Sequence, residues 1–335
     1  MHTYHIPVFV PHKGCPHDCV FCNQRHITGQ ISETTPDDVK RIIEDNLITL
    51  KENYYAEVAF FGGSFTGIEI SKQTELLEAA YPYIKSGRIH GIRCSTRPDY
   101  INREILDNLK KYGTTCIELG VQSTDSHVLK NSHRGHSFED VKKASELIKS
   151  YGIELGLQMM LGLPGDTKEK MLKTAGDLIS LNPACVRIYP TLVVEDTHLC
   201  NMYKSGVYTS LTVEQAVDVL SEIIPMFVRN NIDIIRIGLQ TTDEINENTV
   251  KGPYHPAIKE LAEGRIIRNI IENNLPDDAE IEVFCSPERV SVVSGHGRCN
   301  KLYFKEKYSR RLKVTADASL DRNELRICDK NIAIY

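Results

Sequence analysis

The sequence predicts an α/β protein in which a parallel β-sheet curls into a partial or full barrel, followed by a smaller α+β module. Short apolar runs alternate with helical patterns six times within about 190 residues, and buried strands separated by helices form parallel sheets with right-handed crossovers. Glycine-rich or polar motifs follow almost every predicted strand, and barrel active sites collect at the C-terminal ends of strands. This recurrence favours a barrel over a flat dinucleotide-binding sheet.

The elements of the predicted barrel follow one another from the N-terminus. The first helix is expected to begin at Pro36, with Thr35 as its N-cap. The strands are predicted at residues 5–10, 56–61, 89–95, 115–121, 154–161, 185–190 and 233–237. The helices between them are predicted at residues 36–52, 71–85, 103–112, 138–151, 168–181 and 212–230.

The last hundred residues show a different pattern. Gly252 and Pro253 mark a break in the chain. The elements predicted after the break are a helix over 257–273, a strand over 280–285, a short helix, a helix over 301–308 and a strand over 312–315. We therefore divide the chain into a core over 1–240 and a C-terminal α+β extension over 241–335.

Composition limits the classes of function. The net charge of −5 provides no global nucleic-acid footprint, so any RNA-binding surface must be local. Ten cysteines without an export signal favour a reducing cytoplasm, where cysteines bind metal or lie buried. No stretch approaches the ~20 apolar residues of a membrane span, so we expect a cytoplasmic protein with no membrane partner.

Three cysteines near the N-terminus, Cys15, Cys19 and Cys22, have the spacing C-x3-C-x2-C, with Phe21 directly before the last. A structural zinc site takes four protein ligands, and a [4Fe–4S] cluster normally takes four cysteines. Three thiolates on one loop therefore indicate either a missing ligand or an iron left open for a small molecule. A zinc knuckle and three incidental thiols are the alternatives.

This spacing resembles the signature of the radical S-adenosylmethionine (SAM) enzymes. The resemblance implies a [4Fe–4S] cluster held by Cys15, Cys19 and Cys22, whose open iron binds SAM. It also implies cleavage of SAM to a 5′-deoxyadenosyl radical, with an electron from a donor such as ferredoxin or flavodoxin. The implied fold is the (β/α)6 partial TIM barrel of radical SAM cores, with Phe21 among the residues that contact the cofactor.

The motifs after the second and third strands supply further expected contacts. Gly62, Gly63 and Ser64 match the family's GGE-like motif, whose backbone holds the amino group of SAM, although Ser64 replaces the usual acid. Ser95 and Arg97 would lie at the mouth of the third strand. The plainer interpretation is that Arg97 only pairs with an acidic neighbour.

The fourth and fifth strands carry polar residues inside apolar runs. Glu118 and Gln122 are expected to have partners, because unpaired buried polar groups are costly. In related enzymes a glutamine at the position of Gln122 reaches SAM, and Arg134 matches an arginine that pairs with the SAM carboxylate. Gln158 precedes Gly162 of the adenine-packing motif by four residues, where related enzymes have a ribose-binding carboxylate.

In combination, the segments STRPDYI, ELGVQS, SHRGHS, LGLPGDT and YPTLVV resemble the radical SAM core of the Elongator catalytic subunit over roughly residues 1–240. That family modifies the wobble uridine of tRNA, which implies an RNA substrate, most specifically tRNA. The Elongator subunit also has an acetyltransferase-like domain, for which the remaining residues are too few. We therefore do not expect carboxymethylation from acetyl-CoA.

The C-terminal segment PERVSVVSGHGRCNKLYFKEKY partly resembles a KH RNA-binding fold, in which a GxxG loop between two helices clamps backbone phosphates. Here an arginine occupies the fourth position of that loop. The alternative is a solvated, charged helix on a small cap. The candidate RNA contacts are Gly295, Gly297, Arg298, Lys301 and Lys305.

Two other functions stay open on the sequence alone. One is a radical SAM enzyme that acts on a small molecule or a tetrapyrrole, as in the anaerobic coproporphyrinogen oxidases that share the core. The other is an RNA-binding protein whose iron–sulfur cluster is structural.

Overall fold

The computed structural model describes residues 2–10, 19–22, 33–51, 53–239, 248–276 and 279–335. Seven parallel strands form one curled sheet, a half-barrel, in the order β1-β2-β3-β4-β5-β6-β8. The predicted α/β partial barrel is therefore confirmed. Its strands are β1 (His2–Val10), β2 (Tyr54–Gly62), β3 (Gly91–Thr96), β4 (Thr114–Gln122), β5 (Glu154–Leu161), β6 (Cys185–Pro190) and β8 (Asp233–Ile237).

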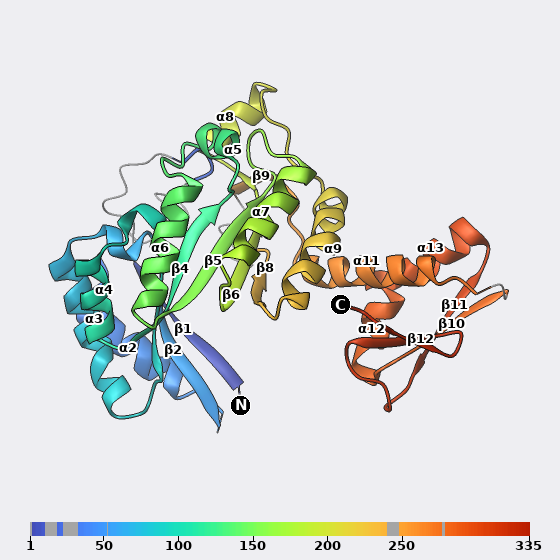
Figure 1. The fold of residues 1–335 in the computed structure, drawn as a ribbon, viewed down its shortest axis with the longest axis horizontal. Helices are drawn as coiled ribbons and strands as arrows, with labels where there is room; N and C mark the ends of the chain where they lie inside the picture. The colour runs from blue at the N-terminus through green and yellow to red at the C-terminus, as the bar shows by residue number, and fades with distance from the viewer. Residues whose placement is uncertain (1, 11–18, 23–32, 52, 240–247, 277–278) are drawn as a thin grey trace.

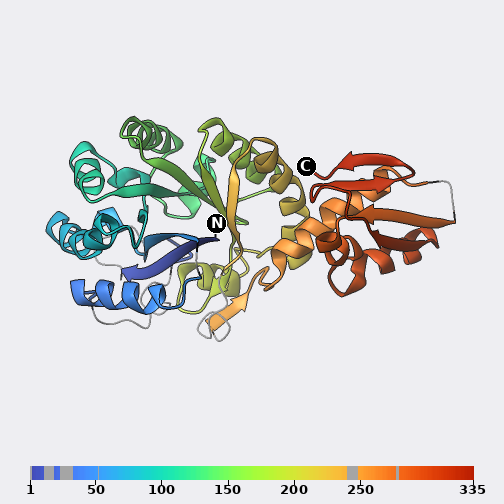
Figure 2. The same cartoon turned by 90° about the horizontal axis from the view of Figure 1, so that it is seen from below.

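Helices cover the outer, convex face of this sheet (Figures 1 and 2). Thr35 caps the first of them through a capping box with Asp38, as the sequence predicted. The helix ends at residue 47 rather than 52. The helices are α2 (Pro36–Leu47), α3 (Ile70–Lys85), α4 (Arg103–Lys111), α5 (Ser126–Asn131), α6 (Phe138–Ser150), α7 (Lys168–Ser180), α8 (His198–Lys204) and α9 (Val213–Arg229).

The sheet separates an apolar layer from a polar interior. On β4, Ile117 and Leu119 are fully buried in the main hydrophobic cluster, which lies between the strands and their covering helices. The side chain of Glu118, which lies between them in the sequence, points to the inside of the half-barrel, because successive side chains of a strand face opposite sides. Charged residues on apolar strands thus mark the concave face.

A second sheet of four strands lies at the other end of the molecule (Figures 1 and 2). Helix α11 (Ile258–Asn273) packs against α9 of the half-barrel and against the helices α12 and α13 beside the second sheet. It therefore connects the half-barrel to this second unit, which consists of the four-stranded sheet and its helices. Strands β10 and β11 pair in parallel, and β12 pairs antiparallel with β10. The other elements are β10 (Glu280–Cys285), α12 (Val290–Ser294), α13 (Cys299–Tyr308), β11 (Arg311–Ala316), β12 (Glu324–Ile327) and β13 (Lys330–Ala333).

Several short elements were not predicted. The hairpin of β12 and β13 turns at Cys328 and Asp329, which have φ angles of 49° and 60°. Both central residues of such a two-residue turn need a positive φ, and glycine is the usual sequence signal for it. Neither residue here is a glycine, so the sequence did not indicate this hairpin. The helices α5 and α8 and the strand pair β7 (Val193–Val194) and β9 (Thr249–Lys251) are too short to produce a periodic pattern.

The described residues also contain four 3₁₀ segments: η1 (Phe65–Gly67), η2 (Pro98–Tyr100), η3 (Pro287–Arg289) and η4 (His296–Arg298). Among the helices that the structure describes, none has the length and hydropathy to cross a membrane.

Candidate cofactor site

A cavity of about 140 Å³ opens on the concave side of the sheet. It lies near the C-terminal ends of β2, β3 and β4, whose last residues are Gly62, Thr96 and Gln122. Thr96, Arg97 and Gly120 line it together with ten of the residues predicted to contact the cofactor or metal. Those ten are Cys19, Phe21, Cys22, Gly62, Gly63, Ser64, Ser95, Gln122, Arg134 and Gln158.

The other predicted site residues lie elsewhere. Glu118 lies next to the cavity, hydrogen-bonded to Gln158. Gly162 and Val20 line a second cavity of about 750 Å³. The hydroxyl of Tyr208 donates to the carbonyl oxygen of Gly162 at 2.6 Å. The consecutive residues Cys19 and Val20 therefore line two different cavities. Cys15 lies outside the described residues.

The two described cysteines of the loop, Cys19 and Cys22, are joined by a tight turn, in which the Cys22 N–H donates to the Cys19 carbonyl at 2.9 Å. Two guanidiniums approach the buried sulfur of Cys19. Nη1 of Arg134 lies 3.4 Å from it and Nη1 of Arg97 lies 4.0 Å from it. A guanidinium N–H can donate a hydrogen bond to a metal-bound sulfur, and such outer contacts orient the ligands of a metal. The donor set therefore fits a metal-bound sulfur.

The two arginines are themselves held in place. Arg97 makes a bidentate pair with Asp99, at 2.9 and 3.1 Å, and also donates to the Arg134 carbonyl. Arg134 donates to the Gly120 carbonyl. Arg97 thus pairs with its acidic neighbour and also lies at the mouth of β3, where it lines the cavity.

Gly62 shapes the wall of the cavity. It has a φ of +107°, and a Cβ added there would lie 2.4 Å from the ring of Phe9 and 2.8 Å from the Val10 carbonyl oxygen. Only glycine fits this backbone, which brings bare peptide groups to the edge of the cavity. The N–H of Gly63 donates to the Val10 carbonyl at 2.9 Å.

Gln122 carries the clearest sign of a missing ligand. It follows an irregularity in β4, has a φ of +71° and is 9% exposed. Its Oε1 is buried without a hydrogen-bond partner among the described residues. A strained backbone and an unpaired buried acceptor are both costly, and they persist at sites where a ligand compensates. SAM has ammonium and hydroxyl donors that suit such an acceptor.

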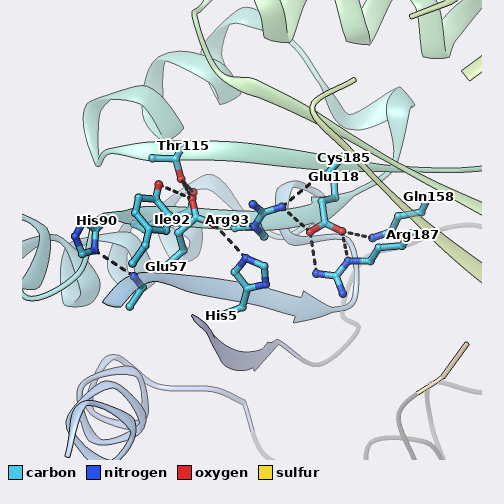
Figure 3. A network of polar contacts seen from close by, with 12 residues as sticks. His5, Glu57, His90, Ile92, Arg93, Thr115, Glu118, Gln158, Cys185 and Arg187 are labelled. Carbon is cyan, nitrogen blue, oxygen red and sulfur yellow. Dashed lines mark hydrogen bonds and ion pairs between the residues drawn. The ribbon is translucent and has the colours of Figure 1, made fainter. Parts of the chain in front are cut away.

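A buried ionic network, referred to below as the floor, adjoins the cavity through Gln158, and Figure 3 shows its side chains. Glu118 accepts hydrogen bonds from Arg187 at 2.6 and 3.0 Å, from Arg93 at 3.1 Å and from Gln158 at 3.0 Å. Arg93 also pairs with Glu57 at 2.9 Å. The expectation that buried Glu118 has partners is confirmed.

Sequence reasoning missed Glu57, Arg93 and Arg187 as parts of this floor. The available signal was one charged residue at an inward position of each of the apolar strands β2, β3 and β6. Burial opposes the ionisation of Glu118, but hydrogen bonds and charge from Arg187 outweigh it, so the pKa of Glu118 lies below the ordinary carboxyl value.

His136 makes stability sensitive to acid. Burial, together with the guanidiniums of Arg134 and Arg97, lowers the pKa of His136 to about 3 from 6.5. The unfolded chain therefore takes up a proton first as the pH falls below 6.5, and stability is lost between pH 6.5 and about 3. From pH 7 to pH 5, urea titrations should show a loss about 2 kcal/mol larger for the wild type than for His136→Gln. Equal losses in both proteins would contradict this assignment.

Comparison with known proteins agrees with this geometry. The model of the radical SAM superfamily matches residues 9–178, and that of the radical SAM C-terminal domain matches residues 183–268. The chain is 33% identical over 198 residues to a tRNA uridine(34) acetyltransferase of Methanocaldococcus infernus, covering 52% of this chain and 37% of that protein. It is 34% identical over 140 residues to Elongator complex protein 3 of Saccharomyces cerevisiae, covering 41% and 25%.

An uncharacterized protein of Methanocaldococcus jannaschii matches over a larger share, with 31% identity over 263 residues that cover 75% of this chain and 79% of that one. Thus the chain spans well under half of the acetyltransferase and Elongator relatives but most of this uncharacterized protein.

Solved structures share the fold. Elp3 of Methanocaldococcus infernus with an N-terminal deletion gives a TM-score of 0.60 at 23% identity, covering 81% of this chain and 63% of that one. SuiB of Streptococcus suis bound to S-adenosylmethionine gives 0.52 at 12% identity, covering 77% and 54%. With half of its length matched by the family model, and with two cysteines of the signature at the cavity, the chain belongs to the radical SAM superfamily, whose enzymes use a [4Fe–4S] cluster and SAM.

Proposed function

We propose that this radical SAM enzyme modifies RNA, and that its substrate is tRNA. The observation that carries the proposal is the 33% identity with a tRNA uridine(34) acetyltransferase, which falls in the shared core rather than in a separate domain. The acetyltransferase and Elongator relatives are much longer than the matched segment, so the final modification made here is a separate question.

In this proposal, Cys15, Cys19 and Cys22 hold the cluster, with Phe21 beside it. The proposed SAM contacts are the predicted residues that line the cavity: Gly62, Gly63, Ser64, Ser95, Gln122, Arg134 and Gln158. Of the other predicted contacts, Glu118 acts through its hydrogen bond with Gln158, and Gly162 lies at the second cavity. When bound, the cluster supplies one electron, delivered by a donor such as ferredoxin or flavodoxin, and SAM supplies the 5′-deoxyadenosyl radical.

The protein's own contribution is positioning and exclusion of water. Arg134 and Arg97 place positive charge at the sulfur of Cys19, and the strained backbone of Gln122 aims an acceptor at the ligand. The lining side chains of Thr96, Arg97 and Arg134 are buried, and in this proposal they help to keep water from reactive species on that side of the cavity.

We further propose that residues 241–335 form an RNA-binding extension of the core at 1–240. Its chain order is β10, α12, a glycine loop, α13 and β11, so the loop lies between two helices, as a KH-like fold requires. A Cβ on Gly295 would lie 2.6 Å from the sulfur of Cys299, so this turn needs glycine. Gly297 is exposed, with open space where its Cβ would be.

Charge pairing separates two groups of cations on this unit. Lys307, Arg311 and Lys313 each form an ion pair, with Glu272, Glu280 and Glu282 respectively. In the part of the chain that the structure describes, no acidic side chain pairs with the three cations at the loop and along α13. These are Arg298, Lys301 and Lys305, and they form the proposed phosphate contacts.

Replacing Arg298 with glutamate should weaken tRNA binding about tenfold or more at low salt, because one phosphate contact becomes a repulsion, and should reduce the salt dependence by about one charge. Fluorescence anisotropy with labelled tRNA measures both quantities. Arg311→Glu makes the same charge change at a paired, exposed arginine, and should change the affinity far less. Equal affinities of the two variants would argue against this surface.

The function itself is tested by nucleoside profiling of tRNA from a strain that lacks the gene. We expect one modified nucleoside to disappear from the digest and to return when the gene is restored. If the tRNA profile stays intact while a small metabolite accumulates, the substrate is not RNA.

A further inference from the structure

The side-chain amide of Gln158 is fixed by two acceptors on the floor of the cavity. Its Nε2 lies 3.0 Å from Oε2 of Glu118 and 3.1 Å from Oγ of Ser95. Gln158 is half-buried on β5 and lines the cavity. Figure 3 shows its amide pointing toward Glu118, which three strands surround.

The charge of Glu118 decides which way this amide faces. The positive charges of Arg187 and Arg93 balance the negative charge of the buried carboxylate. The carboxylate is therefore ionised and can only accept hydrogen bonds. The amide nitrogen of Gln158 must therefore face Glu118, whichever way the nitrogen and oxygen are assigned. The amide oxygen is left to face the cavity. No described residue donates a hydrogen bond to it.

We propose that Glu118 is a positioning residue, which orients Gln158 so that its carbonyl oxygen accepts a hydrogen bond from a ribose hydroxyl of the bound nucleoside. The inference rests on the proposed cofactor site. It also accounts for the amide at this position, because a carboxylate at 158 would lie about 3 Å from that of Glu118 in a buried setting, where like charges repel.

A charge exchange tests the inference. Glu118→Gln removes the group that forces the amide orientation, and Gln158→Glu places two carboxylates side by side. Each should weaken binding of S-adenosylhomocysteine about tenfold, the loss expected for one hydrogen bond to a buried group. The double variant carries one carboxylate and one amide again, so it should recover most of the affinity. Calorimetry on anaerobic, cluster-loaded protein without reductant measures binding independently of turnover.

A milder variant covers the case in which the exchange disturbs folding. Gln158→Met leaves the arginine pairs of Glu118 intact and removes only the acceptor. It should bind S-adenosylhomocysteine about tenfold more weakly than the wild type, yet bind the 2′,3′-dideoxy analogue equally well.

The possible results distinguish a failure of the proposed cofactor site from a failure of the roles given to Gln158 and Glu118. If cluster-loaded wild type binds no S-adenosylhomocysteine, the cofactor site itself is wrong. If the wild type binds it and Gln158→Met binds it as tightly, Gln158 is not the ribose acceptor. If Glu118→Gln folds and binds as tightly as the wild type, or if the folded double variant shows no recovery, Glu118 does not position the amide.

Discussion

Replacing Cys19 with alanine will remove the cluster and SAM cleavage together. Cys19 is a buried thiol next to two guanidiniums, at the wall of the cavity that collects the predicted SAM contacts. Changes to the outer partners of metal ligands already cost 10–100-fold, so loss of a ligand should lower 5′-deoxyadenosine formation by at least about 100-fold. Iron and sulfide analysis after anaerobic reconstitution, with mass spectrometry of the nucleoside product, measures both effects.

A matched thiol controls for general damage. Cys328 is exposed in the hairpin turn of the second sheet, so Cys328→Ser should retain both iron and product. If Cys19→Ala kept its iron and its activity, the assignment of Cys19 as a ligand would be lost.

Replacing Arg187 with methionine should lower the free energy of unfolding by about 3–5 kcal/mol. Arg187 is 8% exposed and donates to both carboxylate oxygens of Glu118, which is 1% exposed. Without it, a buried carboxylate keeps only Arg93 and Gln158 as partners. Urea denaturation at neutral pH measures the loss.

The matched control is a bidentate pair of the same type on the surface. Arg88 donates to both oxygens of Glu44 at 2.7 Å, and both side chains are about 45% exposed. Exposed pairs contribute little, so Arg88→Met should leave stability nearly unchanged. If the two methionine variants lost equally little, the buried network would not be a stabilising unit.

The strands of the half-barrel could be predicted because their signal is local. Predominantly apolar runs gave β5, β6 and β8 the same bounds that the structure shows. The α5 and α8 helices could not be predicted, because six or seven residues are too few for a helical period. Their positions depend on packing, such as the hydrogen bond from the Leu199 N–H to the Val20 carbonyl.

The candidate site shows the same division. Motifs at strand ends brought most predicted contacts to one cavity, because parallel strands end at the same edge. The inward charges of the floor had a sequence signal, but their pairing could not be predicted, because the partners lie on different strands and Glu57 and Arg93 are 36 residues apart. Gly162 turns the chain just after β5, with a φ of +77°, and lies at the second cavity.

We propose that the cysteine loop and the concave cavity together cleave SAM for the modification of tRNA. The most direct measurement is 5′-deoxyadenosine formation by anaerobically reconstituted enzyme given SAM, a chemical reductant and tRNA from a strain lacking the gene. We predict that the product forms, and forms faster with this tRNA than with tRNA from the parent strain, which is already modified. No 5′-deoxyadenosine from protein with a full complement of iron and sulfide would contradict the account.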